Sequence, residues 1–209
     1  DDPEIADLAR RALANNPSDQ ALAALRKELN EATRPEWQVA LINALAFQVG
    51  WWALVLSASR DHAAVGLLVV GLVLTWHLTR VRPGPAEAAL ITVATFIGLA
   101  FDSLLLATGW VEFAGGALFG VLAPLWMVAL WANFAATLNV SLRALRARPW
   151  LAALLGGLGG PLAYWGGAGL GAMSLVEPLP ALLVLAAGWA VLTPLLFRLA
   201  TWLEARPWR

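Results

Sequence analysis

The stretch GGLGGPLAYWGGAGLG, residues 156–171, decides the fold of this chain. Eight of its sixteen residues are glycine, and it lies inside an uncharged run from Pro149 to Val176. In water such a segment would fray, because glycine loses more backbone freedom on ordering than any other residue. Inside a membrane the backbone must satisfy its own hydrogen bonds, so a helix is favoured. We therefore expect this segment to be the central helix of a polytopic membrane protein.

The glycines of this segment recur four residues apart, in the pairs Gly156/Gly160 and Gly167/Gly171. Small residues at this spacing allow two membrane helices to approach each other closely. The segment therefore predicts a helix whose glycine face packs directly against a neighbouring helix.

Three prolines, Pro124, Pro161 and Pro194, fall inside apolar stretches that we expect to be spans. Each removes one helical hydrogen bond, so each predicts either a kink or a break that frees a carbonyl group. The sequence Gly160–Pro161 favours a break most, because the proline follows a run of glycines.

The composition of the whole chain agrees with a membrane location. Of the 209 residues, 60% are hydrophobic and 13% are charged, and the mean hydropathy is +0.68. Soluble domains are about 45–50% apolar and about 25% charged. The absence of cysteine excludes disulfides and thiolate metal sites, and two distant histidines argue against zinc. We predict no metal, no cofactor and no nucleic-acid partner, since the chain has no basic domain.

Residues 1–36 differ from the rest and carry eight of the fourteen acidic residues. Asp2 and Pro3 are typical of a helix start, and the sequence 15–17, Asn-Asn-Pro, ends that helix. A second short helix follows, so this part is predicted to be a soluble αα-hairpin, too small to be stable alone. It resembles one unit of a helical repeat, and both a fusion segment and a native cytoplasmic segment stay open.

The remaining part, residues 37–209, predicts six transmembrane helices, because a span needs about 20 mostly apolar residues. The expected spans cover residues 37–58, 63–79, 88–108, 113–142, the glycine-rich run within 149–176, and 181–202. The fourth stretch is longer than one crossing requires. Its glycine-rich start, residues 115–120, is therefore a loop, part of a tilted helix, or a broken helix.

The arginines predict the orientation, since positive residues favour the cytoplasmic side. They precede the first span and follow the second, fourth and sixth; the other linkers carry only Arg60, beside Asp61. This alternation predicts that both termini are cytoplasmic. The fold class is thus an all-α, six-span membrane protein preceded by a soluble hairpin.

Polar residues inside spans are costly and are functional candidates. Asp102 is the only acidic residue within a span, and Gln48 and Tyr164 lie near the middle of the first and fifth spans. Asp102 either carries a proton, binds a cation or acts as a general acid, or else it holds neighbouring helices together. Gln48 and Tyr164 approach Asp102 if spans one, three and five pack together.

Other side chains complete the candidate ligand-binding set. Asn133 joins Gln48, Asp102 and Tyr164 as a polar contact, although Asn133 and Asn139 are more typical of hydrogen bonds between helices. Six tryptophans away from the interfaces either wall an apolar cavity or pack against glycines; they are Trp51, Trp52, Trp126, Trp131, Trp165 and Trp189. His77 and Arg198 are expected at the cytoplasmic interface, the latter by snorkelling.

These residues also carry a resemblance to a known family. The chain resembles the bacterial inner-membrane family of unknown function numbered 2878 in four places: Asn43 with Phe47-Gln48-Val-Gly50-Trp51-Trp52, Asp102, the run from Pro124 to Phe134, and Gly160-Pro161-Leu-Ala-Tyr164-Trp165-Gly166. The similarity covers about residues 37–206. It implies a multi-pass protein of the bacterial inner membrane and brings no reaction or ligand with it.

Three functions follow from these residues as hypotheses. The first is a protein that binds or moves an apolar or lipid-like molecule in an intramembrane pocket formed by Gln48, Asp102, Asn133, Tyr164, Trp126 and Trp165. The second is an intramembrane lipid-modifying enzyme that uses Asp102, against which stands the shortage of nucleophiles and metal ligands. The third is a scaffold that packs with another membrane protein through the glycine-rich fifth helix. We assign no catalytic residue.

Overall fold

The computed structural model describes residues 36–208. By its internal contacts the chain divides into two units, Asp1–Val39 and Ala40–Arg209, and the description below concerns the second. The predicted hairpin and its interpretation as a fusion segment fall on residues outside the described part.

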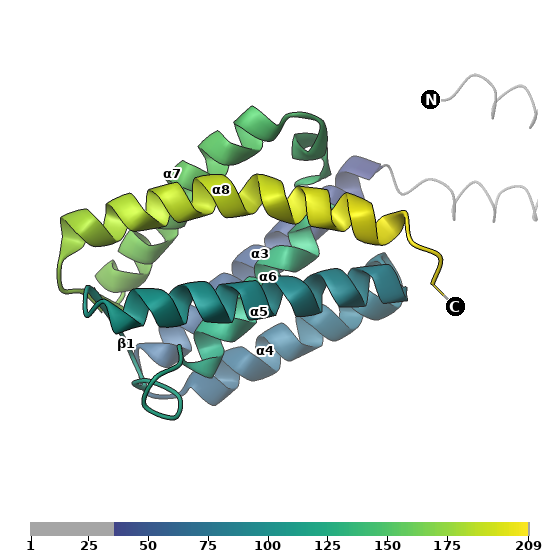
Figure 1. Ribbon diagram of the computed structural model, residues 1–209. Coiled ribbons are helices and arrows are strands. Elements are labelled where there is room, and N and C mark those ends of the chain that lie inside the picture. The colour runs from purple at the N-terminus through teal and green to yellow at the C-terminus, as the bar shows by residue number, and fades with distance from the viewer. Residues whose placement is uncertain (1–35, 209) are drawn as a thin grey trace, which may run out of the picture. The chain divides into compact units, whose positions relative to one another are not determined.

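The described residues form an all-α bundle, as the sequence predicts. Its helices are α3 (Glu36–Ala58), α4 (Ala63–Trp76), α5 (Pro85–Ala107), α6 (Leu125–Leu138), α7 (Pro149–Gly169) and α8 (Pro178–Glu204). A π-helical turn, η1 (His77–Val81), continues α4, and a 3₁₀ segment, η2 (Arg143–Ala147), precedes α7. Two strands of three residues, β1 (Val111–Phe113) and β2 (Met173–Leu175), were not predicted. Figure 1 shows the arrangement.

Within residues 36–208, four segments are long and apolar enough to cross a membrane: α3, α4 together with η1, α5 and α8. The other two helices are α6 and α7. The helix α6 has 14 residues and is therefore about 21 Å long, less than the ~30 Å hydrocarbon core. The helix α7 has 21 residues but is not among these four segments.

The first part of the expected fourth span, residues 113–142, is not helical. Residues 114–124 form a loop in which Gly115, Gly116 and Gly120 have positive φ, a conformation that glycine adopts without steric cost. Pro124 immediately precedes α6, so it is not inside a helix. Pro161 and Pro194 do lie inside helices, and α7 continues through Pro161, so of the two alternatives for this proline the break is not found.

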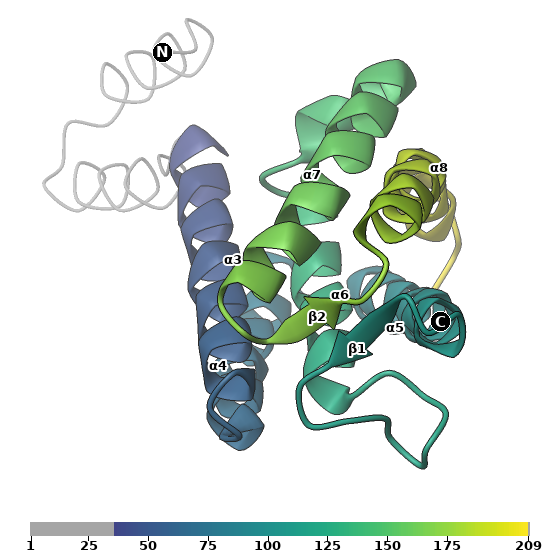
Figure 2. The same ribbon diagram turned by 90° about the vertical axis from the view of Figure 1, so that its left-hand side faces the viewer.

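The central helix is α6, so our expectation for the glycine-rich helix is wrong. Nine of the 14 residues of α6 are buried, against five of the 21 residues of α7. Both views place α6 in the middle of the bundle (Figures 1 and 2). The glycine-rich α7 is a peripheral helix that packs along α8 and exposes Leu154, Leu158 and Leu162.

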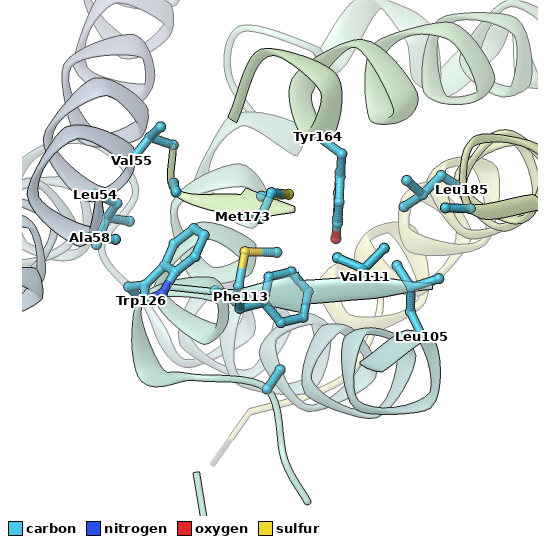
Figure 3. Packing of buried hydrophobic residues seen from close by; sticks show 14 of the residues in the cluster. Leu54, Val55, Ala58, Leu105, Val111, Phe113, Trp126, Tyr164, Met173 and Leu185 are labelled. Carbon is cyan, nitrogen blue, oxygen red and sulfur yellow. The ribbon is translucent and has the colours of Figure 1, made fainter. Parts of the chain in front are cut away.

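The strands join two linkers that are far apart in sequence. β1 follows α5 and β2 follows α7, and they pair antiparallel with Val111 opposite Leu175 and Phe113 opposite Met173. Beneath them lies an apolar cluster that includes Leu54, Val55, Leu105, Trp126 and Leu185 (Figure 3). This cluster holds the ends of α3, α5, α6 and α8 together at the end of the bundle that carries the strands.

The close approach of α7 to α8 depends on Gly156 and Gly160, as predicted. A Cβ at Gly156 would lie 2.2 Å from Thr193 Oγ1, and one at Gly160 would lie 2.3 Å from Trp189 Cγ. The second predicted pair is wrong as a helix-packing pair, because Gly171 lies beyond the end of α7 and has a positive φ of 80°.

We expect Gly160→Ala to lower the free energy of unfolding by about 1–3 kcal/mol, because the added methyl group overpacks against Trp189. The neighbouring Gly159 is the matched control, since a Cβ there meets open space. Gly159→Ala should be neutral, or stabilising by up to about 1 kcal/mol through helix propensity. Unfolding in mixed SDS micelles measures both variants. Equal destabilisation would contradict the packing described for α7 and α8.

Candidate functional site

The one acidic residue of the expected third span lies at a junction of three helices. Asp102 on α5 is fully buried, with an exposed fraction of 0%. Its Oδ2 accepts a hydrogen bond of 2.8 Å from Trp131 Nε1 on α6. Its Oδ1 accepts a hydrogen bond from the Tyr164 hydroxyl on α7. The carboxyl group is therefore a fixed acceptor that holds α6 and α7 against α5.

A glycine and a ring stack position these donors. One turn before Asp102, a Cβ at Gly98 would lie 2.0 Å from Trp131 Cγ, so only glycine leaves room for this indole against α5. The other face of the Trp131 ring stacks on Trp189 of α8, with ring centroids 4.5 Å apart and planes inclined by 12°. Tyr164 extends from α7 with its hydroxyl oxygen directed into the bundle (Figure 3). Together these contacts fix the aromatic rings around Asp102.

Beside this junction lies a cavity of about 920 Å³, which we call the interhelical cavity. It is lined by residues of α3, α6, α7 and α8, together with residues in and next to η2 and β2. Seven of the lining side chains are aromatic: Phe47, Trp51, Trp52, Trp131, Phe134, Tyr164 and Trp189. Lys, Arg, His, Asp and Glu are absent from the described residues that line it. Such a volume and lining are typical of sites for small apolar ligands.

The exposure of its lining residues shows where the cavity opens. Gln48 and Trp52 on α3 and Leu155, Gly159 and Leu162 on α7 are exposed. These two helices flank the opening, and Figure 2 shows them on neighbouring sides of the bundle. The cavity therefore opens laterally between α3 and α7, on a side that would face lipid in a bilayer.

The structure brings together only part of the predicted site. Tyr164 lines the cavity and also bonds to Asp102, and Gln48 lines it from α3. Asp102 itself lies behind Tyr164 and Trp131 and does not line the cavity. The expected approach of Tyr164 to Asp102 is thus found. Gln48 lines the cavity from α3 and makes no hydrogen bond to Asp102.

Three predicted residues lie elsewhere. Asn133 donates a 2.9 Å hydrogen bond to the Phe47 carbonyl oxygen and ties α6 to α3. Trp126 donates to the Ala114 carbonyl oxygen near the strands. Trp165 has an exposed fraction of 64% and lies on the outer surface of α7. None of the three lines the cavity, and ligand binding by any of the predicted residues stays a prediction.

The two interpretations of the tryptophans both apply. Trp131 packs against Gly98, Trp189 against Gly160, and the tip of Trp51 lies 3.7 Å from the Cβ position of Gly166. The same three tryptophans line the cavity. The same rings therefore both pack against glycines and line the cavity.

Thr193 is a lining residue that the sequence did not indicate to us. It lies four residues after Trp189 on α8, and this pair faces Gly156 and Gly160, which have the same spacing on α7. The equal four-residue spacing of the two pairs is the sequence signal that could have indicated Thr193. Trp189 Nε1 and Thr193 Oγ1 are buried without a hydrogen-bond partner in the described part. The contact between α7 and α8 thus depends on shape rather than on hydrogen bonds.

A second polar group, at the opposite end of the bundle from the strands, was also missed. Its centre is Glu87 in the first turn of α5. Glu87 has an exposed fraction of 4%, and its Oε1 lies 2.9 Å from Nε2 of the fully buried His77. Asn139 donates to Glu87 Oε2 at 2.6 Å, and Arg82 Nε lies 3.8 Å from the same oxygen. His77 is therefore buried within the protein, and its expected position at the cytoplasmic interface stays a prediction.

Glu204 extends this group to the end of α8. Arg146 donates to Glu204 Oε2 at 2.6 Å and to Asn139 Oδ1, and Arg82 donates to Glu204 Oε1. We call the six residues His77, Arg82, Glu87, Asn139, Arg146 and Glu204 the polar network. It joins η1, α5, α6, η2 and α8. The predicted role of Asn133 and Asn139 in hydrogen bonds between segments is confirmed.

The six helices of residues 36–208, with four segments long and apolar enough to cross a bilayer, have the pattern of a helical membrane protein. Within that class, residues 40–195 match a family described as "Protein of unknown function (DUF2878)". The match covers most of the chain, so the chain belongs to this family, and the resemblance seen in the sequence is confirmed. Searches of curated proteins and of solved structures found no match.

Proposed function

We propose that this protein binds or moves an apolar, lipid-like molecule in the interhelical cavity. The observation that carries this proposal is the cavity itself, with about 920 Å³ of space, aromatic and aliphatic walls, and a lateral opening between α3 and α7. Ligand sites of this size are mostly apolar with a few placed polar groups. Here Gln48 and Tyr164 are the polar side chains from the predicted set that reach the wall.

Two observations favour this function over the alternatives. Asp102 is shielded by Trp131 and Tyr164, which disfavours an enzyme that uses this carboxylate on a lipid. The Gly156/Gly160 face is already covered by α8, which disfavours a scaffold that docks through these glycines. In this proposal Asp102 is a positioning residue that holds two walls of the cavity.

The proposed setting is a bacterial inner membrane that the chain crosses six times, with both termini in the cytoplasm. Arginine-bearing linkers alternate with linkers that carry none or only Arg60. Arg82 and Arg146 of the polar network lie together at one end of the bundle, which supports a common side for these linkers. The short α6 crosses with the help of the loop 114–124 that precedes it.

Single cysteines test this topology, because the chain has none of its own. Arg143 and Ser174 are both exposed and lie on either side of α7 in the sequence. We expect Ser174→Cys to react with an impermeant maleimide added outside spheroplasts, and Arg143→Cys to react only after lysis. Reaction of both from one side would contradict a crossing by α7, and the reverse pattern would contradict the orientation.

Filling the cavity tests the function. Gly159 lines the cavity and has open space at its Cβ position, so Gly159→Phe should occupy part of the cavity without a clash. We expect at least about a tenfold loss of binding of a radiolabelled C16 hydrocarbon to the full chain in nanodiscs, because displaced apolar contact costs more than 1.4 kcal/mol.

The control is Gly71→Phe, the same substitution at an open position of α4 that does not line the cavity. This variant should bind the hydrocarbon as the original chain does. Binding that is unchanged by Gly159→Phe, or absent from the original chain, would overturn the proposed function.

A further inference from the structure

Three hydroxyl groups on the wall of the interhelical cavity are engaged within the protein, and the unpartnered atoms Trp189 Nε1 and Thr193 Oγ1 are themselves buried. The Tyr164 hydroxyl donates to Asp102, the Thr137 hydroxyl donates to the Phe134 carbonyl oxygen, and the Ser141 hydroxyl donates to Asn43. These groups keep their geometry without a ligand. They therefore give the wall little free capacity to bind a polar group.

Gln48 is different. Its side chain lines the cavity and is exposed, and its amide makes no hydrogen bond within residues 36–208. It is the thirteenth of the 23 residues of α3, close to the middle of the helix. A free amide at this depth in hydrocarbon is costly, and a ligand that bonds to it removes that cost. An amide offers both a donor and an acceptor.

The charge of the wall restricts which polar group can bind there. No basic or acidic side chain is among the described lining residues, so a carboxylate, phosphate or ammonium group would be buried without a counter-charge. Burying an unpaired charge costs far more than burying a neutral hydrogen-bonding group. The bound polar group must then be uncharged.

We infer that the interhelical cavity selects an uncharged long-chain lipid with a single hydrogen-bonding oxygen, such as a fatty alcohol, and that Gln48 binds this oxygen at mid-membrane depth. The aromatic wall formed by Trp51, Trp131 and Trp189 contacts the chain of the ligand. This places the polar end of the ligand at the lateral opening, close to mid-membrane depth, the reverse of an ordinary membrane lipid. The inference rests on the proposed function and adds the class of ligand and the residue that recognises it.

Three radiolabelled probes of equal chain length test it: 1-hexadecanol, hexadecanoate at pH 8, and hexadecane, each equilibrated with the full chain in nanodiscs. Hexadecanol should bind about tenfold more tightly than hexadecane, the difference expected for one hydrogen bond, and hexadecanoate should bind less tightly than hexadecanol. Gln48→Leu should remove the advantage of hexadecanol and leave hexadecane binding unchanged.

Gln38→Leu is the matched control, because Gln38 is on the same helix ten residues earlier and does not line the cavity. It should leave all three affinities unchanged. If hexadecanoate binds as well as hexadecanol, or Gln48→Leu has no effect on hexadecanol, the inference is overturned, while hexadecane binding that Gly159→Phe abolishes still supports the proposed function. If no probe binds, both fail together.

Discussion

Asp102→Ala should lower the free energy of unfolding by about 2–4 kcal/mol. The substitution leaves the Trp131 indole N–H and the Tyr164 hydroxyl buried without their acceptor. Each orphaned donor costs about 1–3 kcal/mol, although hydrogen bonds between membrane helices average only about 0.6 kcal/mol. Since the two donors come from α6 and α7, the loss acts on three helices at once. Unfolding in mixed SDS micelles, followed by tryptophan fluorescence, measures it.

Asp102→Asn and Thr95→Ala are the comparison variants for this experiment. Asparagine keeps one acceptor oxygen, so Asp102→Asn should be intermediate between the original residue and alanine. Thr95 is on the same helix and donates only to the Ile91 carbonyl oxygen of that helix, so Thr95→Ala should change stability by less than about 0.5 kcal/mol. If Asp102→Ala unfolds like Thr95→Ala, the junction has no structural role and the site built on it fails.

Glu87→Ala is expected to be the most destabilising substitution in the polar network, by about 3–5 kcal/mol. Glu87 is buried and is the shared acceptor of His77 and Asn139, with Arg82 nearby. Removing one partner of a buried charged cluster costs this much, because the others keep their desolvation cost. Loss of these bonds should also release η1 and α5 from each other. The same unfolding assay measures the effect.

Glu204→Ala is the comparison within the same network. Glu204 also binds two arginines, but its side chain has an exposed fraction of 29% and water can replace it. We expect a loss of no more than about 1 kcal/mol, as for other partly exposed ion pairs. Comparable losses for Glu87→Ala and Glu204→Ala would contradict the difference in burial on which this prediction depends.

The sequence was sufficient for the features that depend on local pattern. Apolar runs predicted the helices α3, α4, α5 and α8 within a few residues, because span length follows from bilayer thickness. The four-residue spacing of Gly156 and Gly160 predicted a close helix contact, since small residues at that spacing lie on one face. Both inferences need only neighbouring residues along the chain.

The sequence was not sufficient where several segments decide the outcome together. Pro124 and the preceding glycines admit a helix, a kink or a loop, and the pairing of β1 with β2 and the packing of Trp126 on Ala114 favour the loop. The central position of α6 likewise depends on packing around it, which hydropathy does not report. The glycine content of α7 is a local pattern in the sequence, whereas the burial of the short α6 is not.

The candidate site likewise contains some contacts that the sequence predicts and others that it does not. The contact between Asp102 and Tyr164 was expected, because two polar residues in separate spans gain by bonding in lipid. Trp126 and Trp165 were expected with them, but the face on which a tryptophan lies depends on helix rotation. The polar network was missed because its six residues come from five segments, and each is ordinary within its own segment.

The pairing of β1 with β2 also limits how the bundle can move. Main-chain hydrogen bonds join the segment after α5 to the segment after α7, so the carboxyl ends of these two helices move as one body. Rotation of α7 away from α3 then has its hinge at the strands, and the displacement grows toward the amino end of α7. At that end of the bundle Arg146 of η2 bonds to Glu204 of α8 and to Asn139 at the end of α6, so these bonds would have to break before η2 could follow α7.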